Sequence, residues 1–182
     1  MADLPLAVHE LQTPIGELMI VSDREGNIRA VDWRDHEERM QRLLRLHYGS
    51  NGFLLQPARG LDAATLAIDR YFKGEIGAIG ELPIKTGGTV FQRYVWRALR
   101  DIPGGDTISY GKLALRIGRP GAIRAVGLAN AANPIGIVVP CHRVIGADGA
   151  LRGYGGGLDR KAWLLAHERA ALAAPNESAV RE

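Results

Sequence analysis

Cysteine is almost absent from this sequence, which holds a single one, Cys141, among 182 residues. A lone cysteine cannot form a disulfide within the chain. The first three histidines, His9, His36 and His47, have no cysteine near them and no metal-ligand spacing, so we expect no metal site there. Apolar runs long enough to cross a bilayer are also missing, and the first residues lack the basic and apolar stretches of a signal peptide. These absences predict a protein of the reducing cytoplasm, without membrane contact.

The remaining composition is typical of a globular protein, with 46% hydrophobic and 24% charged residues. The length allows one large domain or two small ones. The net charge of +3 hides an asymmetry between the two halves. Residues 1–84 carry nine basic and thirteen acidic residues, whereas residues 85–169 carry thirteen basic and five acidic ones. The basic second half favours a polyanionic partner, nucleic acid above all, and a solvated surface without a partner is the equal alternative.

The pattern of residues 1–86 predicts a small α/β domain and a linker. Three short strands separated by turn residues form an antiparallel meander between residues 5 and 33. Helical spacing then predicts two helices, over residues 36–48 and 61–73. Five glycines and a proline mark residues 74–88 as the linker. No residue pattern in this half predicts chemistry.

Residues 87–171 are predicted to form a second, mainly helical domain, and residues 172–182 a flexible tail. Apolar spacing predicts four helices here, over residues 89–102, 110–117, 122–132 and 159–169. We expect a capping box at Thr89 and further N-caps at Ser109 and Asp159. The last helix is expected to turn three residues inward: Leu158, Ala162 and Leu165.

The second and third of these helices, joined by a turn at residues 118–121, form a helix-turn-helix pattern, which generic helical hairpins share. The third helix has one cation, Arg124, and otherwise small residues such as Ala122, Ala125 and Gly127. It lacks the long polar side chains that read base edges in the major groove. Small residues suit close contact with the minor groove, but they also allow close packing inside the core, which the residue pattern by itself favours slightly.

Cys141 follows an apolar run, residues 137–139, that predicts a buried strand. A lone buried cysteine is usually an inert small hydrophobe. The adjacent His142 and the arginine after it favour a thiolate nucleophile instead. Neighbouring residues of a strand point to opposite faces, so we expect His142 to reach the thiol through a bend or a bridging water. Glu168 falls close to the buried stripe of the last helix, where it needs a partner such as His142.

Short motifs follow one another through residues 89–168. In chain order they are Phe91-Gln92, Val95-Trp96, Ile102-Pro103, Ser109-Tyr110, Arg124-Ala125-Val126-Gly127, Asn133-Pro134, Pro140-Cys141-His142-Arg143-Val144, Gly153-Tyr154 and Leu164-Leu165 with Glu168. Together they resemble the DNA-binding, catalytic domain of the O6-alkylguanine-DNA alkyltransferases, whereas the N-terminal third is similar only in style. The resemblance implies an α/β (α+β) fold, in which a small N-terminal antiparallel sheet with helices precedes a mainly helical domain that holds the helix-turn-helix and the cysteine.

The resemblance also implies DNA repair without a cofactor. Cys141 would accept an alkyl group from O6-alkylguanine, with O4-alkylthymine as a further candidate, after the base flips out of duplex DNA. The thioether has no easy route back, so each molecule, a monomer, would act once. His142 would activate the thiol through a water while Glu168 orients the imidazole, which keeps Cys141 partly ionised near neutral pH. Asn133 would hold the active-site turn, and Tyr110 would give the leaving guanine a proton or a hydrogen bond.

The same resemblance assigns the base pocket to four residues: Val144, Tyr154, Gly155 and Gly156. It assigns minor-groove contact to four others: Arg124, which fills the gap left by the flipped base, Ala122, Ala125 and Gly127. Gly155 stands where some relatives carry a serine, so a hydrogen bond to the base oxygen there must come from the backbone. The zinc ligands of some relatives' N-terminal domains are missing, and we expect no metal.

Two other classes of function stay open. A hydrolase that uses Cys141, His142 and Glu168 would turn over esters or amides and would need no DNA. A non-catalytic protein that binds alkylated DNA is the other alternative, but such proteins replace the reactive cysteine, and Cys141 is present here.

Overall fold

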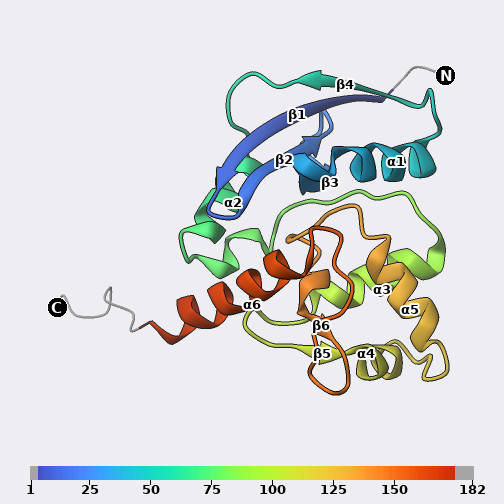
Figure 1. The fold of residues 1–182 in the computed structure, drawn as a ribbon. Coiled ribbons are helices and arrows are strands. Elements are labelled where there is room, and N and C mark those ends of the chain that lie inside the picture. Colours follow the sequence, from blue (N-terminus) through green and yellow to red (C-terminus); the bar gives the residue numbers. More distant parts are fainter. Residues whose placement is uncertain (1–3, 175–182) are drawn as a thin grey trace.

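The computed structural model describes residues 4–174. They form two layers, a four-stranded sheet with two helices and a mainly helical half that carries Cys141 (Figure 1). Three strands form the expected antiparallel meander: β1 (Leu4–Thr13), β2 (Gly16–Ser22) and β3 (Ile28–Trp33). A fourth strand, β4 (Phe53–Pro57), pairs parallel with β1, so the sheet is mixed. The sequence pattern does not predict β4 because the strand is short and ends in a proline, which weakens a strand signal.

The two helices expected in the first half are confirmed as α1 (Glu37–Tyr48) and α2 (Ala63–Phe72). Alternate side chains of β2 serve two different cores, as the strand period of two requires. Val21 packs with Leu44 of α1 on one face of the sheet. Ile20 lies on the other face, in the core that the sheet shares with the helical half.

The glycine-rich segment 74–88, whose composition predicts a linker, is packed against the sheet. It contains a 3₁₀ helix, η2 (Ile76–Ile79), whose two isoleucines are buried. Farther along, the amide of Ile28 in β3 donates to the carbonyl of Pro83 (2.9 Å), and the amide of Lys85 donates to the carbonyl of Ile28 (3.0 Å). Apolar residues interspersed among the glycines explain the difference, because burying them binds the segment to the edge of the sheet.

In the described part of the chain, the second half contains four α-helices: α3 (Val90–Arg100), α4 (Tyr110–Arg116), α5 (Ile123–Ala131) and α6 (Leu158–Ala173). Two short parallel strands, β5 (Ile108–Ser109) and β6 (Val144–Ile145), lie between them. The capping box at Thr89 is confirmed, and Ser109 caps α4 as expected. α4 and α5 pack together as the predicted helix-turn-helix pair.

The last helix, α6, differs from its prediction. It begins after Gly157, which adopts a φ of 93°, so Asp159 lies in the first turn and is not the N-cap. It continues to Ala173, beyond the predicted end, and the rest of the predicted tail, residues 175–182, lies outside the described residues. Leu158 and Ala162, predicted to pack inward, are exposed. The buried stripe consists of Lys161, Leu164, Leu165 and Glu168. Counting the apolar period from Leu158 gives the wrong phase, because two charged residues belong to the buried face.

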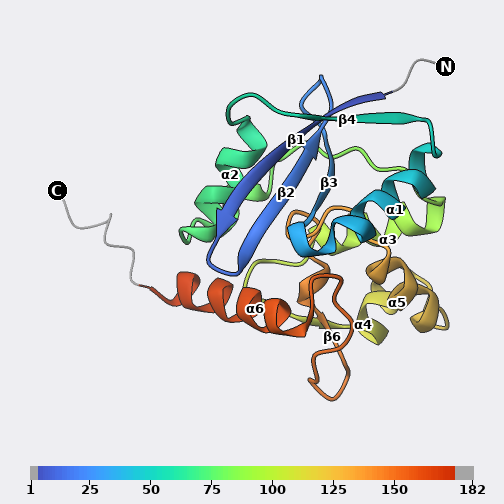
Figure 2. The same cartoon turned by 45° about the horizontal axis from the view of Figure 1, so that its top comes forward.

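Both layers share one hydrophobic core. Ile28 and Val31 of β3 lie in the same buried cluster as Val95 and Leu99 of α3, and Cys141 belongs to it. Figure 2 shows the sheet crossing over the helical layer, with α6 running along one side. Among the described residues, no helix has the length and apolar character needed to cross a membrane.

Candidate active site and DNA-binding surface

Cys141 lies on a 3₁₀ turn, η3 (Cys141–Arg143), and the predicted strand through this residue is wrong. The apolar run before it is buried as irregular chain, because a short run of this kind is compatible with several conformations. Ile137 adopts a φ of 69°, which is strained for a β-branched residue. Asn133 holds this chain: its Nδ2 donates to the carbonyl of Val139 (2.8 Å), and its Oδ1 accepts from the amide of Ile135 (3.0 Å). These bonds match the turn-holding role predicted for Asn133.

The sheet also holds the chain that leads to Cys141. The amide of Val31 in β3 donates to the carbonyl of Pro134 (2.9 Å), and the amide of Gly136 donates to the carbonyl of Val31 (3.0 Å). Arg39 of α1 donates from Nη2 to the carbonyl of Asn133 (3.2 Å). The first half of the chain therefore helps to build the active-site turn.

His142 and Glu168 form the predicted pair: Nε2 of His142 lies 2.8 Å from Oε1 of Glu168, and both side chains are fully buried. The same carboxylate accepts from Nη2 and Nε of Arg143 (2.9 and 3.0 Å), from the hydroxyl of Tyr71 (2.8 Å) and from the amide of Gly105 (2.9 Å). Burial alone would raise the pKa of Glu168, but the hydrogen bonds and charges of His142 and Arg143 hold it well below its usual range. Glu168 is therefore an ionised carboxylate inside the protein.

Burial lowers the pKa of His142 despite the neighbouring carboxylate. The imidazole is thus neutral in the resting protein. Its Nδ1 is buried and has no hydrogen-bond partner among the described residues. A neutral imidazole fixed through Nε2, with Nδ1 unpaired, can accept a proton.

Burial raises the pKa of Cys141, against the opposing influence of the Asn133 side chain and of the cations Arg39 and Lys161. The expectation of a partly ionised thiol near neutral pH is therefore wrong for the resting protein. The sequence places a histidine and an arginine beside the cysteine, but Arg143 turns away to Glu168 and to the carbonyl of Ile102. The thiol is left fully enclosed, and burial favours its neutral form.

A small pocket at Cys141 is lined by three of the residues predicted for the base pocket: Tyr154, Gly155 and Gly156. Its volume is about 10 Å³, so the pocket is nearly closed. A Cβ on Gly155 would collide with the guanidinium of Arg39, and a Cβ on Gly156 would collide with the indole of Trp33. Gly156 is therefore kept small by the rigid indole of Trp33, whereas a side chain at Gly155 would require the flexible end of Arg39 to move. Both neighbours come from the first half of the chain, which sequence patterns do not connect with the pocket.

Val144, the fourth residue predicted for the base pocket, is buried and does not line it. Its carbonyl accepts from Nζ of Lys161 (2.6 Å), which donates also to the carbonyl of Arg152 (2.6 Å). Burial lowers the pKa of Lys161 to about 8. The hydroxyl of Tyr110 donates to the same carbonyl of Arg152 (3.0 Å). The fully buried Lys161 escapes sequence analysis because a lysine normally indicates an exposed helix face.

Burial, followed by the neighbouring Cys141, raises the pKa of Tyr110. The phenol therefore keeps its proton at neutral pH. Its hydroxyl donates to the carbonyl of Arg152 (3.0 Å), and the donor role toward the leaving guanine stays a prediction.

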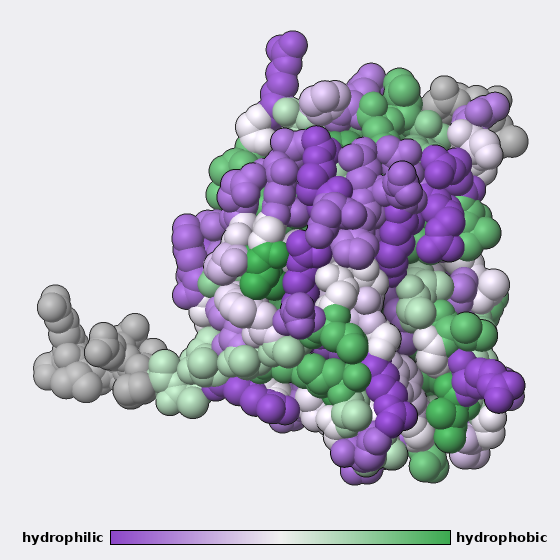
Figure 3. Space-filling model, viewed as in Figure 1, coloured by the Kyte–Doolittle hydropathy of each residue, from purple (hydrophilic) through white to green (hydrophobic). Residues whose placement is uncertain are grey.

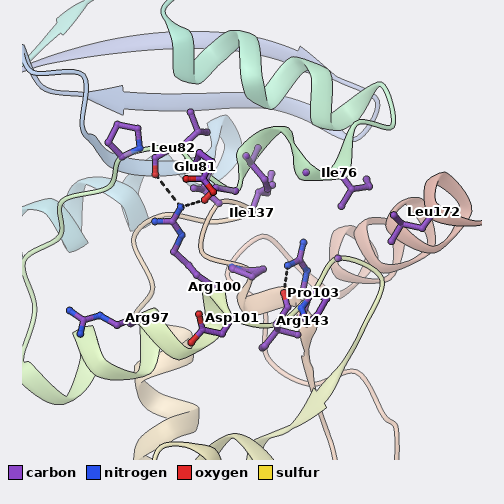
Figure 4. Close-up of a pocket in the computed structure, with 18 residues that line it drawn as sticks. Ile76, Glu81, Leu82, Arg97, Arg100, Asp101, Pro103, Ile137, Arg143 and Leu172 are labelled. Atoms are coloured by element: carbon purple, nitrogen blue, oxygen red, sulfur yellow. Dashed lines mark hydrogen bonds between the residues drawn. The ribbon is translucent and has the colours of Figure 1, made fainter. Parts of the chain in front are cut away.

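A larger groove, of about 810 Å³, lies behind the active-site turn, between η2, the end of α3 and residues 137–140 (Figure 4). Arg100 donates to the carbonyls of Gly80 (2.6 Å) and Leu82 (3.1 Å) along one wall of the groove. Cys141 does not line this groove, so the hollow is separate from the thiol pocket.

The helix α5 presents Arg124 and Ala125 to solvent, whereas Ala122 and Gly127 are half-buried. A Cβ on Gly127 would lie 3.9 Å from the ring of Tyr110, so this glycine faces α4. Two large apolar residues of α5 are also exposed, Ile123 and Leu128. Hydrophobic and hydrophilic residues alternate over this part of the surface in Figure 3. The helix therefore combines a cation with small and apolar side chains on an exposed face.

Comparison with known proteins identifies this architecture. Residues 90–170 match the family described as 6-O-methylguanine DNA methyltransferase, DNA binding domain. The methylated-DNA–protein-cysteine methyltransferase of Salmonella typhimurium is 49% identical over 165 residues, which are 91% of this chain and 96% of that relative. The chain belongs to the methylated-DNA–protein-cysteine methyltransferase family. A further family member, from Haemophilus influenzae, is 42% identical over 86% of this chain and 83% of its own length.

Solved structures extend the family likeness to the N-terminal third. The crystal structure of Mycobacterium tuberculosis OGT in complex with DNA matches 92% of this chain and 94% of its own, with a TM-score of 0.75 and 38% identity. The O6-methylguanine-DNA methyltransferase of Pyrococcus kodakaraensis matches 90% of this chain and 98% of its own, with a TM-score of 0.65 and 28% identity. The family match thus covers both layers of the fold, beyond the motifs in residues 89–168.

Proposed function

We propose that the protein repairs duplex DNA by moving the alkyl group of O6-alkylguanine onto Sγ of Cys141, once per molecule. The observation that carries the proposal is the buried thiol at a small pocket, on the same turn as a His142 paired with Glu168. The name of the family members, methylated-DNA–protein-cysteine methyltransferase, supports this chemistry. O4-alkylthymine is a further candidate substrate.

In the proposed reaction, Sγ forms a bond with the alkyl carbon while the bond between that carbon and O6 breaks. The thiol proton passes to Nδ1 of His142, directly or through one water, and Glu168 stabilises the imidazolium that forms. Tyr110 gives the leaving guanine a hydrogen bond or a proton. The imidazolium of His142 then releases the former thiol proton, to the guanine itself or to the phenolate of Tyr110, so that guanine and both side chains end neutral. The products are guanine and a thioether, and the thioether has no easy route back. Asn133 keeps the turn in place during this exchange.

The base must reach a pocket that is nearly closed in the resting protein. We propose that Tyr154, Gly155 and Gly156 form its walls and that Val144 supports it from behind. The duplex would bind through its minor groove to α5, with Arg124 in the space of the flipped base and Ala122, Ala125 and Gly127 allowing close approach. The protein would act as a monomer. The unpaired thiol favours the reducing cytoplasm as its compartment.

The requirements of the two other function classes disfavour them. A hydrolase needs turnover and an oxyanion site, whereas attack on a saturated carbon needs only a nucleophile and a protonated leaving group. A non-catalytic lesion binder has no use for a nucleophilic cysteine beside a paired histidine.

Stoichiometric alkylation of Cys141 is the first prediction. Mixing the protein with duplex DNA that contains O6-methylguanine should add the mass of one methyl group per molecule, and peptide mapping should locate it at Cys141. Cys141→Ser should bind the same DNA and gain no mass, which separates binding from transfer. A modified residue elsewhere, or many turnovers per molecule, would contradict the proposed reaction.

A further inference from the structure

A tyrosine of the first half reaches the catalytic pair. Tyr71 lies on α2, 97 positions before Glu168, and its hydroxyl donates to Oε1 of Glu168 at 2.8 Å. Its side chain is fully buried. Burial and the carboxylate raise the pKa of Tyr71 well above its usual value, so the phenol is a permanent donor.

The hydroxyl of Tyr71 binds the carboxylate oxygen that His142 uses. Oε1 of Glu168 accepts from Tyr71, from Nε2 of His142 (2.8 Å) and from Nη2 of Arg143 (2.9 Å). Oε2 accepts from Nε of Arg143 (3.0 Å) and from the amide of Gly105 (2.9 Å). Arg143 and Gly105 would satisfy an isolated buried carboxylate by themselves. The hydroxyl of Tyr71 is an additional donor, and it stabilises part of the negative charge of Oε1 that would otherwise act on the imidazole of His142.

An aromatic cluster between α2 and α6 fixes the position of Tyr71. Nε2 of His167 lies 2.8 Å from the carbonyl of Tyr71. The ring of Trp163 stacks on His167 with 4.7 Å between centroids, and Phe72 packs against both rings. Tyr71 is therefore held through its backbone carbonyl, its ring and its hydroxyl, and the hydroxyl points at one oxygen.

We propose that Tyr71 is a positioning residue for alkyl transfer, through which the sheet-bearing half of the chain fixes the carboxylate of Glu168 and sets the orientation and basicity of His142. The inference rests on the proposed function. It gives the first half of the chain a specific contribution to the chemistry, in addition to its packing.

Tyr71→Phe removes only the hydroxyl and keeps the ring in the cluster. Oε1 then has fewer donors, so more of its charge bears on His142 and the imidazole binds a proton more tightly. The groups that face this pair are Arg143 on the same turn, Lys161 on α6 and Tyr71 itself on α2. Because His142 must be neutral to accept the thiol proton, the acid limb of the pH–rate profile should move to higher pH. On that limb the rate of transfer should fall about tenfold for a shift of about one pKa unit, because the neutral fraction of His142 falls by that factor.

The experiment measures single-turnover transfer from methylated duplex DNA between pH 5 and 9, and the imidazole titration of His142 by NMR in the same proteins. Tyr48→Phe is the matched control, because Tyr48 also lies in the first half and donates to a backbone carbonyl, that of Lys85 (3.2 Å), away from the pair. It should leave both measurements unchanged. Replacement of Tyr71 by 3-fluorotyrosine, a stronger donor of nearly the same size, should move the acid limb the opposite way and guards against a folding defect in Tyr71→Phe.

The outcomes separate the inference from the proposed function. A slower Tyr71→Phe protein with an unshifted pH profile and an unshifted His142 titration would mean that Tyr71 is only structural, and would overturn the inference. Equal rates in both proteins would overturn it as well. Wild-type protein that transfers no alkyl group would instead overturn the proposed function, while the NMR titration of His142 would still test the coupling between the two halves.

Discussion

At the scale of single residues, the buried thiol of Cys141 has the clearest consequence. Burial raises the pKa of Cys141. The pH–rate profile for alkylation by iodoacetamide should therefore have its midpoint above a pH of about 8.5, the pKa of a free thiol. Cys141 is the only cysteine, so the same protein unfolded in urea is its own control and should return to the free-thiol value. A folded midpoint below that value would mean that the thiolate is preformed.

Glu168 makes a second prediction at this scale. The pKa of Glu168 is held below its unfolded value of about 4.3, so the stabilisation it provides is present above that pH and is lost as the pH falls below it. Glu168→Gln should lower the free energy of unfolding at neutral pH by about 3 kcal/mol, because Arg143 loses its buried partner. It should also reduce the pH dependence of unfolding below pH 4, measured by urea titration. Glu81→Gln, at an exposed position, is the control and should change neither.

At the scale of elements, α5 is defined by Arg124 among small residues. If Arg124 occupies the space of a flipped base, Arg124→Ala should slow repair of duplex DNA strongly and leave the reaction with free O6-benzylguanine nearly unchanged, since the free base needs no flipping. A phosphate contact would instead weaken binding evenly and lower the salt slope. Both substrates should be measured over a range of salt, with Arg169→Ala on the exposed face of α6 as control. Equal losses on both substrates would mean that α5 supports the pocket or the fold.

Elements with a strong local pattern are predicted well by the sequence. The capping box at Thr89 and the apolar stripe after it define α3, because both signals lie within one helix. β4 is missed because its pairing with β1 is set by chain far away in the sequence. The strand predicted at Cys141 fails for a related reason: Asn133 and Val31 hold the chain in a turn through contacts that an apolar run does not reveal.

At the scale of the whole molecule, the sequence locates the chemistry in the second half and misses what the first half adds. The pair of His142 and Glu168 is predictable from the cost of a buried carboxylate. Trp33, Arg39 and Tyr71 are not, because each has an ordinary place in a strand or helix of its own and acquires its role only when the two layers pack. Residues far apart in sequence meet at the site because the two layers share a core.

The shared core predicts that the molecule unfolds as one cooperative unit, although the sequence suggests two domains. Ile68 of α2 is fully buried in this core, so Ile68→Ala should remove about 2–5 kcal/mol of stability. Cys141 labelling reports on the other half of the chain. In Ile68→Ala, the urea concentration at the midpoint of Cys141 labelling should decrease by the same amount as the midpoints followed by tryptophan fluorescence and by far-UV circular dichroism. Leu66→Ala, at an exposed position of the same helix, should shift none of them. If Ile68→Ala lowered the fluorescence midpoint and left the labelling midpoint of Cys141 unchanged, the two halves would unfold as independent domains. The contact of Tyr71 with Glu168 would then join two separately stable units.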